Sequence, residues 1–475
     1  MPLPEDLTRA VRREVGARCF LDSPSDVAAY GYNCYPKFTE PAAVVLFEDK
    51  HQIERVVPML YERGIPMVIR GSGTNISGSA LAPTGGVVLS LERMTKILEL
   101  DEVSRFVRVE AGVNVKQLQD RVQAANLLFP PNPGNVDAVT VGGIVGCNSS
   151  GDLALGYGTT KDFVLGLEVV LGDGKMLKLG SRVRKDVTGY DLSRLIVGSE
   201  GTLGIVVEAT LRLVDRPEAE ASVLATFSDQ QSGAEAALSL FDHHLAPVAV
   251  EYMDAATTRA VETAFALGLP AAAQSSMLVK FHGNSESVNL SAKRCVELFT
   301  REHALTTRQA LAGEPADHLW RARHLAYPAL ARICPTLYGE DIVVPVRHFA
   351  AAIARTHALA QEIGLSIALF AHAGDGHLHP ILLTDDSDPV QHAKSDRFVE
   401  AVIVMAIEFG GTITGEHGLG VHKTRFIHHQ YGDAEQALMR AVKHAFDPKG
   451  LFNPMIFPVT GPEPKTVRRK GIEIL

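Results

Sequence analysis

The sequence predicts an α+β protein of two domains, and three observations support this class. The chain has 475 residues, which is too long for one simple hydrophobic core, so we expect two or three domains. Its first half is rich in glycine and contains short strands. After Pro217 the composition changes, and strand-like pieces alternate with alanine-rich helices, which is typical of an α+β domain with an antiparallel sheet.

Two helices are expected before the first glycine-rich loop, at residues 5–18 and 49–63. Apolar residues recur on one face of each segment. Pro58 should kink or delay the second helix, and Gly64 should end it.

Short strands dominate the rest of the first half. Residues 66–70 form a buried strand that runs into a glycine loop. Segments 165–171 and 175–179 flank Gly172-Asp173-Gly174, a hairpin signal. Residues 205–213 alternate as a strand with one polar face.

The second half repeats a strand-and-helix pattern. The expected strands are 222–227, 277–282 and 367–372. The expected helices are 231–240, 254–265, 286–303, 350–363 and 393–409.

Composition restricts the class of partner and the compartment. A net charge of −9 and a pI near 6.1 argue against nucleic acid as a partner. The five cysteines form no CxxC pair, which argues against a disulfide framework, an iron–sulfur cluster or a structural zinc site. The first residues lack the apolar region of a secretory signal, and no run of 18 apolar residues occurs. We therefore expect a cytoplasmic protein, either free or peripheral at the inner face of the membrane.

One glycine-rich motif near the C-terminus carries adjacent acid and base groups. Glu416 and His417 lie between glycines, about forty residues after a segment with histidines at 372, 377 and 379. Two imidazoles and one carboxylate suit a borderline divalent metal such as Zn, Fe or Mn and leave open positions for a substrate. His417 is then left over as a general base near neutral pH. The pattern predicts metal-assisted proton abstraction.

Three glycine-rich segments of the first half predict a site for a flat, extended ligand. The first, Arg70-Gly-Ser-Gly-Thr-Asn-Ile-Ser-Gly78, follows a strand and can form an anion-binding nest for a pyrophosphate. It matches neither a Rossmann fingerprint nor a P-loop. The second combines residues 130–134 with 140–151. The third covers residues 185–192 and 198–205.

In this order, and with Asn453-Pro454 near the end, these segments resemble a known family. It comprises the FAD-dependent D-2-hydroxyacid dehydrogenases and oxidases of the vanillyl-alcohol oxidase fold, with D-lactate dehydrogenase, the glycolate oxidase flavin subunit and D-2-hydroxyglutarate dehydrogenase among them. The resemblance covers about residues 20–456 and every motif occurs in order.

The resemblance implies three parts of the chain. Residues 1–216 would form a PCMH-type FAD-binding domain of two α/β subdomains, with the PCMH part at about 38–216. Residues 217–420 would form an α+β cap domain for the substrate, with an antiparallel sheet. Residues 421–475 would return to the FAD-binding domain.

It also implies the residues that contact FAD. The pyrophosphate loop would use Arg70, Gly71, Ser72, Gly73, Thr74, Asn75, Gly78 and Ser79. The isoalloxazine and ribityl chain would lie against Pro131, Gly134, Thr140, Gly142, Gly143, Gly146, Asn148, Ser149, Gly151 and Tyr157. The adenosine part would lie along Glu200, Gly201, Gly204 and Ile205, and Asn453 would reach the flavin from the tail.

Noncovalent FAD is expected. Some relatives attach the flavin through His or Cys, but position 72 is Ser, where the attaching histidine usually lies. We interpret Cys147, in the second segment, as a small buried thiol.

The same resemblance assigns the catalytic groups. It implies three metal ligands, His372, His379 and Glu416, and His417 as the catalytic base. His377 falls outside this ligand set. Trp320-Arg-Ala-Arg323 resembles the W-x-x-R element of the family, so Arg323 would pair with the substrate carboxylate. The C2 hydride would pass to flavin N5.

Positions around the substrate predict a short monocarboxylate, D-lactate first and glycolate next. Relatives that use dicarboxylates carry a Thr where this chain has Tyr327 and an Asn where it has Ile381. They also carry a Lys that is missing between His324 and Val346. An unpaired second carboxylate would be costly in a closed site. Arg332 could rescue the binding of a dicarboxylate such as D-2-hydroxyglutarate or D-malate.

Electrons must leave the reduced flavin, and the chain has no cysteine cluster or haem motif of its own. A separate acceptor is therefore expected, which could be a quinone, an electron-transfer flavoprotein or an iron–sulfur subunit. The protein could act as a homodimer or in a multi-subunit complex. Three alternatives stay open: a metallohydrolase using His372, His379 and Glu416, a noncatalytic flavin electron-transfer subunit, and an oxidase that uses O2.

Overall fold

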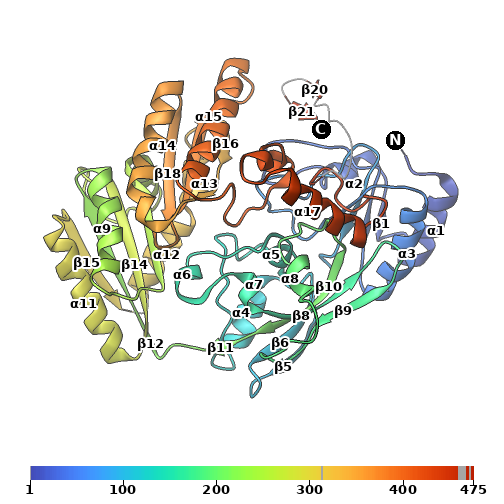
Figure 1. Cartoon of the computed structure of the whole chain (residues 1–475), viewed down its shortest axis with the longest axis horizontal. Helices are drawn as coiled ribbons and strands as arrows, with labels where there is room; N and C mark the ends of the chain where they lie inside the picture. The colour runs from blue at the N-terminus through green and yellow to red at the C-terminus, as the bar shows by residue number, and fades with distance from the viewer. Residues whose placement is uncertain (1, 312–313, 458–466, 470–471, 475) are drawn as a thin grey trace.

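The computed structural model describes residues 2–311, 314–457, 467–469 and 472–474. Figure 1 shows two lobes, one formed by the first half of the chain and the other by a large sheet with its helices. The helix α17 (Asp433–Phe446) belongs to the second half of the chain but lies over the first lobe.

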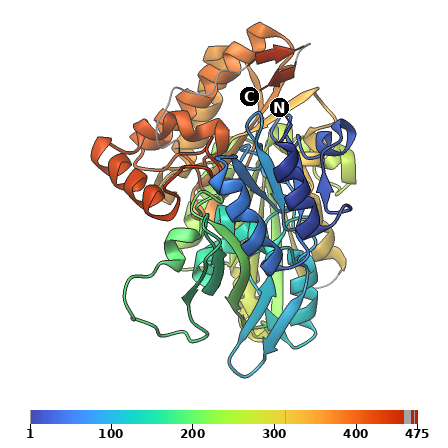
Figure 2. The same cartoon turned by 90° about the vertical axis from the view of Figure 1, so that its right-hand side faces the viewer.

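The first lobe begins with a four-stranded mixed sheet and two helices. These elements are α1 (Glu5–Val15), α3 (Lys50–Glu62), β1 (Phe20–Leu21), β2 (Ala43–Leu46), β3 (Met67–Arg70) and β4 (Val87–Ser90). The strand order is β1-β2-β4-β3, and β4 pairs in parallel with β2 and β3. Helices α1 and α3 lie side by side and share one apolar core with the strands (Figure 2). Helix α3 continues through Pro58, whereas α1 ends earlier than expected because Gly16 adopts a φ of 84°.

A second sheet of the first lobe is antiparallel throughout. Its strands, in spatial order, are β5 (Ile97–Asp101), β6 (Phe106–Glu110), β10 (Ile205–Arg212), β8 (Val164–Val170) and β9 (Met176–Gly180). The strand predicted at 205–213 is confirmed as β10, and all but its last residue are buried, including Glu208 and Thr210 of the polar face. Glu208 tolerates burial there because Lys50 and Arg108 neutralise it at 2.6 and 2.9 Å.

The second lobe is built on an eight-stranded antiparallel sheet in the order β15-β12-β14-β13-β18-β19-β16, with β17 also paired to β19. Its strands are β12 (Ala219–Phe227), β13 (Ala249–Asp254), β14 (Ser275–Gly283), β15 (Thr306–Leu311), β16 (Thr336–Gly339), β17 (Ile342–Val343), β18 (Ser366–His372) and β19 (His377–Thr384). The predicted antiparallel sheet is therefore confirmed, with β13, β15, β16, β17 and β19 in addition to the expected strands.

Helices cover both faces of this sheet. They are α9 (Gln230–Asp242), α10 (Ala255–Phe265), α11 (Ser285–Arg301), α12 (Glu314–His324), α13 (Ala326–Leu330), α14 (Phe349–Ile363) and α15 (Pro389–Glu408). Successive strand residues belong to different cores: Val223 packs in the core of α9, α11, α14 and α15, and Leu224 in the core of α10, α12 and α13. Burial on both faces explains why these strands are apolar without alternation.

The C-terminal segment after α17 runs beside β3. Met67 bridges Phe452 in parallel, and the Asn453 amide NH donates to the Met67 carbonyl at 2.8 Å. Residues 458–466, 470–471 and 475 of the predicted 421–475 segment lie outside the described residues. The boundaries at 216 and 420 stay a prediction. No helix in the described part of the chain is both long and apolar enough to span a bilayer.

Candidate active site

A cavity of about 580 Å³ is lined by residues of both lobes. Many of the predicted cofactor residues lie in its wall: Gly71, Ser72, Gly73, Thr74, Asn75, Ser79, Gly134, Thr140, Gly142, Gly143, Gly146, Ser149, Glu200, Gly201 and Gly204. The predicted catalytic residues Arg323 and His417 and the predicted metal ligands His372, His379 and Glu416 line the same cavity. The three flavin segments and the proposed chemistry thus share one space.

Some predicted cofactor residues do not line the cavity: Arg70, Gly78, Pro131, Asn148, Gly151, Tyr157, Ile205 and Asn453. Arg70 donates instead to the Tyr32 carbonyl at 2.8 Å. The Tyr157 hydroxyl hydrogen-bonds to His282 Nδ1 at 2.9 Å. Asn453 donates to the carbonyls of Ser79 and Glu200 at 2.9 and 2.7 Å, so it supports the cavity wall from behind.

The glycines of the wall fit a ligand that approaches the backbone. A Cβ atom added at Gly134 or Gly146 would meet nothing within 4 Å, so their side-chain positions open into free space. Gly151 is required by the backbone and not by a ligand. It has a φ of 97°, and a Cβ there would lie 2.2 Å from the Asn132 carbonyl oxygen. These residues fit the predicted noncovalent FAD.

Two adjacent strands and one loop bring the metal-ligand candidates together. His372 ends β18 and His379 lies on β19, with His372 opposite His377 and Phe370 opposite His379. Glu416 Oε1 lies 3.4 Å from His372 Nε2 and 3.5 Å from His379 Nε2. These three residues and His377 each offer one possible ligand atom, and the four atoms all lie within 4.8 Å of one another. Two imidazoles and a carboxylate in this arrangement fit a divalent metal.

His377 differs from the other two histidines. It does not line the cavity, and its Nε2 lies 3.7 Å from Asp341 Oδ2. Its Nε2 has no hydrogen-bond partner among the described residues and lies in the same 4.8 Å group as the three predicted ligands, so the prediction that His377 supports the site without being a ligand stays a prediction.

Electrostatics sets the ionisation of the cluster. Burial alone would lower the pKa of His372, but the Glu251 carboxylate, 2.6 Å from its Nδ1, holds the pKa well above its usual range. Burial lowers the pKa of His379 well below its usual value. Burial would raise the pKa of Glu416, but its interaction with His372 holds the pKa well below the usual range. Glu416 is thus a carboxylate, and His379 a neutral imidazole.

His417 is the next residue after Glu416 and points into the same cavity. Its Nε2 lies 3.7 Å from Glu416 Oε1, and its Nδ1 lies 3.5 Å from Asp341 Oδ2. Burial lowers the pKa of His417. A neutral imidazole can accept a proton at neutral pH.

Arg323 reaches the cavity from α12. Its guanidinium pairs with Glu251 Oε2 at 2.5 Å and lies over the Phe370 ring at 4.5 Å from the centroid. The helix is held by Trp320, whose indole NH donates to Ser222 Oγ at 2.8 Å. Glu251 therefore contacts both Arg323 and His372 and fixes them relative to each other.

The segment with Glu416 and His417 is hydrogen-bonded to all three flavin segments. Asn75 Nδ2 and Ser77 Oγ donate to the His417 carbonyl at 2.8 and 2.7 Å. Glu416 Oε2 accepts from Ser150 Oγ and the Gly151 amide, both at 3.1 Å. The Leu419 and Gly420 amides donate to Glu200 at 3.0 Å each. The position of the proposed base is thus fixed relative to the cofactor segments.

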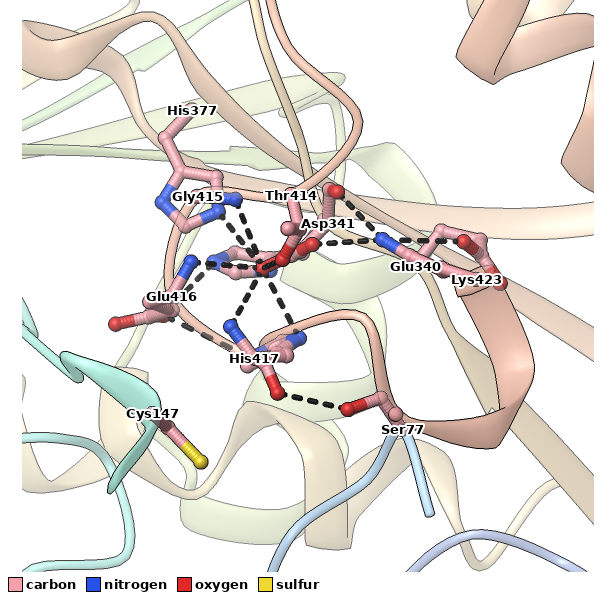
Figure 3. Close-up of polar contacts among 12 residues, drawn as sticks. Ser77, Cys147, Glu340, Asp341, His377, Thr414, Gly415, Glu416, His417 and Lys423 are labelled. Carbon is pink, nitrogen blue, oxygen red and sulfur yellow. Dashed lines mark hydrogen bonds and ion pairs between the residues drawn. The ribbon is translucent and has the colours of Figure 1, made fainter. Parts of the chain in front are cut away.

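The sequence analysis did not identify several buried charged residues in and next to the site: Asp152, Glu251, Asp341 and Lys423. Glu340 is also buried, but it does not line the cavity and makes its hydrogen bond to His422. Figure 3 shows Asp341 among Thr414, Gly415, Glu416, His417 and Lys423. One signal in the sequence was available, because Glu251 and Asp341 interrupt apolar strand-like runs, and a buried carboxylate needs partners.

Comparisons with known protein families support the cofactor. A family described as "FAD linked oxidases, C-terminal domain" matches residues 216–456. Another, described as "FAD binding domain", matches residues 41–180.

Similar proteins cover nearly the whole chain. The glycolate oxidase subunit GlcD of Bacillus subtilis is 35% identical, over 95% of this chain and 96% of that protein. The D-lactate dehydrogenase of Anaerostipes hadrus is 32% identical, over 87% of this chain and 89% of that protein. The structure of p-cresol methylhydroxylase with substrate bound superposes with a TM-score of 0.81 at 17% identity, covering 96% of each chain. It confirms the predicted vanillyl-alcohol oxidase-like fold. By its matched domains and these relatives, the chain belongs to the family of FAD-linked oxidases.

Proposed function

We propose that this protein is an FAD-linked dehydrogenase that oxidises a small D-2-hydroxyacid, D-lactate first and glycolate next, to the 2-oxoacid. One observation carries the proposal. Arg323, His417 and the group of His372, His379 and Glu416 line the same cavity as the glycine-rich flavin segments. The names of the relatives, which are a glycolate oxidase subunit and a D-lactate dehydrogenase, agree with this substrate class.

In this proposal the residues of the chain bind the acid and remove one proton. The Arg323 guanidinium binds the substrate carboxylate. His417, neutral because it is buried, accepts the hydroxyl proton at Nε2. Glu251 holds Arg323 and His372 in place, so that the carboxylate and hydroxyl ends of the substrate are fixed together. When bound, FAD supplies the acceptor for the C2 hydride, and a divalent metal at His372, His379 and Glu416 supplies a Lewis acid for the hydroxyl.

The cavity wall favours a monocarboxylate. Among the described residues that line it, Arg323 is the single Lys or Arg side chain. Tyr327 and Ile381 line it as well, whereas Arg332 is exposed and does not line it. A second carboxylate would therefore lack a cationic partner, which disfavours D-2-hydroxyglutarate and D-malate.

A separate electron acceptor completes the proposal. The five cysteines of the chain are all single thiols, so they offer no disulfide that could take electrons from the flavin. The name of the glycolate oxidase relative describes a subunit, which agrees with transfer to a partner protein.

The test compares the wild-type protein with His417→Ala, both loaded with FAD. Flavin reduction by D-lactate under anaerobic conditions is followed by stopped-flow absorbance. We expect His417→Ala to retain FAD but to reduce it about 10² to 10⁴ times more slowly. Equal rates would contradict the role of His417. The substrate class is tested on the wild type, and a higher kcat/KM for D-malate than for D-lactate would contradict the monocarboxylate assignment.

A further inference from the structure

We propose that Asp341 is a positioning residue that holds the 414–417 segment, and with it Glu416 and His417, in the geometry that the reaction needs. The inference rests on the proposed function, because it assigns the reason why His417 points at the substrate. Asp341 lies between β16 and β17 of the second lobe and is fully buried. It does not line the cavity and so acts through other residues.

One oxygen of Asp341 organises the segment. Asp341 Oδ2 accepts hydrogen bonds from Thr414 Oγ1 at 3.1 Å and from the amides of Gly415, Glu416 and His417 at 3.1, 2.9 and 2.8 Å. Three successive amides that converge on one anion form a nest, which is normally a site for a bound anion. Here a carboxylate of the chain itself fills the nest (Figure 3), so the path of the 414–417 segment depends on it.

The same oxygen faces the imidazole of His417. Nδ1 of His417 lies 3.5 Å from Asp341 Oδ2 and, among the described residues, has no hydrogen-bond partner. Nε2 is directed to the side of Glu416. A carboxylate beside one ring nitrogen favours a proton on that nitrogen and leaves the other free as a base. Asp341 thus lies on the Nδ1 side of the ring, opposite the nitrogen that we propose accepts the proton.

The other oxygen of Asp341 is neutralised from behind. Lys423 Nζ donates to Asp341 Oδ1 at 2.7 Å and to the carbonyls of Asp341 and Ile413 at 2.6 and 3.1 Å. Lys423 is itself buried. The ammonium group compensates the buried carboxylate, so the nest can be filled by a full negative charge.

These contacts define a sharp substitution. Asp341→Asn keeps the size of the side chain but has one acceptor atom in place of two. Either the nest or Lys423 must then face an NH2 group, which cannot accept their hydrogen bonds. Neither orientation of the amide preserves both sets of contacts.

A matched control lies next to it in the chain. Glu340 is equally buried, and its Oε2 lies 3.4 Å from Lys423 Nζ, but its hydrogen bond goes to His422 at 2.5 Å and it makes no polar contact with the 414–417 segment among the described residues. Glu340→Gln therefore removes a carboxylate near Lys423 and leaves the nest filled.

The experiment measures two properties of the FAD-loaded wild type, Asp341→Asn and Glu340→Gln. The first is amide hydrogen exchange of residues 414–417, followed by mass spectrometry. The second is the rate of flavin reduction by D-lactate, measured together with the Kd for D-lactate. For Asp341→Asn we expect exchange about tenfold faster, which corresponds to the net strength of about one hydrogen bond. We expect reduction about 10² times slower, with FAD content retained and the Kd nearly unchanged. Glu340→Gln lowers overall stability but stays folded at neutral pH and leaves the nest filled, so the exchange of residues 414–417, compared with that of other buried segments, and the rate of reduction should stay close to the wild type.

Other outcomes would overturn the inference. Unchanged exchange in Asp341→Asn would show that the carboxylate does not hold the segment, and the same changes in Glu340→Gln would show an unspecific effect of charge loss. If none of the 2-hydroxyacids tested reduces the flavin of the wild type, the proposed function fails. The exchange result alone then decides whether Asp341 holds the segment. Should Asp341→Asn fail to fold, Thr414→Val replaces it. This variant removes a single donor of the nest and is expected to speed exchange of residues 415–417 severalfold, and unchanged exchange would again overturn the inference.

Discussion

The buried charged residues around the cavity form small groups of opposite charge. Glu251 contacts both His372 and Arg323, and Lys423 contacts both Asp341 and Glu340. A buried charge without a partner would cost several kcal/mol of folding free energy, so each carboxylate and its cation must be kept together. Glu251 also raises the pKa of His372, whereas burial lowers the pKa of His379 and of His417.

Glu340 predicts a pH dependence of stability. Burial alone would raise its pKa, but the charges of His422 and Lys423 lower it from 4.5 to about 2. A carboxyl group with a depressed pKa contributes stability above its unfolded value, and this contribution is lost as the pH falls toward the folded value. We expect Glu340→Gln to remove about 3 kcal/mol of unfolding free energy at neutral pH and progressively less between pH 4.5 and 2. Urea midpoints at pH 7, 4 and 3 measure this, and a difference that is constant across this range would contradict it.

Gly146 predicts a separation between folding and cofactor binding. Because a Cβ added at Gly146 meets nothing within 4 Å, Gly146→Val should leave the apoprotein at least as stable as the wild type. The added side chain projects into the cavity, where we place FAD. We expect the Kd for FAD to rise by at least about tenfold, which corresponds to a loss of about 1.4 kcal/mol or more of binding free energy, and the flavin content after purification to fall with it. Flavin absorbance per protein and the urea midpoint of the apoprotein are the two measurements. Full flavin content would show that the cofactor does not pass over Gly146.

At the scale of elements, the site depends on a few short segments between the large sheets. The strands β18 and β19 place the histidines, α12 places Arg323, and the loop after α15 carries Glu416 and His417. Hydrogen bonds then tie that loop to the flavin segments through Asn75, Ser77 and Ser150.

The C-terminal return predicts a measurable contribution to stability. Asn453 is buried, has a φ of 45°, and donates to two buried carbonyls. Asn453→Ala leaves both carbonyls without this donor and puts Ala in a left-handed conformation that Asn tolerates better. We expect a loss of about 2 to 4 kcal/mol of unfolding free energy by urea titration. Asn289→Ala on the exposed side of α11 is the control and should change stability by less than about 0.5 kcal/mol. Equal losses of unfolding free energy in the two variants would contradict the stabilising role of Asn453 in the C-terminal segment.

Periodicity located most large helices and the longer strands of the second lobe. Strand β19 was not predicted, because its histidines and Pro380 interrupt the apolar pattern and its pairing with β18 is a tertiary contact. The polar face of β10 was predicted, but its burial was not, because the sequence does not reveal that Lys50 and Arg108 neutralise Glu208.

The site could be predicted where neighbouring residues carry the signal, as in Glu416-His417. Asp341 and Glu251 could not be placed from the sequence, because their partners lie 76 and 121 residues away along the chain. The predicted roles of Arg70 and Tyr157 at FAD have less support, because both side chains bond elsewhere, to Tyr32 and His282.

At the scale of the whole molecule, the first lobe supplies the glycine-rich wall and the second supplies the charged wall of one cavity. The C-terminal segment crosses back to the first lobe (Figure 1). There Phe452 and Asn453 contact β3 through backbone hydrogen bonds. In the proposed function the substrate lies between the proposed base and the proposed cofactor, as a hydride transfer over a short distance requires.

The most direct test of the central claim is anaerobic bleaching of the flavin absorbance of the purified protein on mixing with D-lactate, with L-lactate in parallel. Oxidation of a D-2-hydroxyacid in this cavity predicts fast bleaching with D-lactate and none with L-lactate. In the proposal Arg323 binds the carboxylate, His417 binds the hydroxyl and FAD faces the C2 hydrogen, so only one enantiomer can place all three groups. Bleaching with L-lactate alone, or with neither lactate nor glycolate in a metal-loaded yellow protein, would contradict the account.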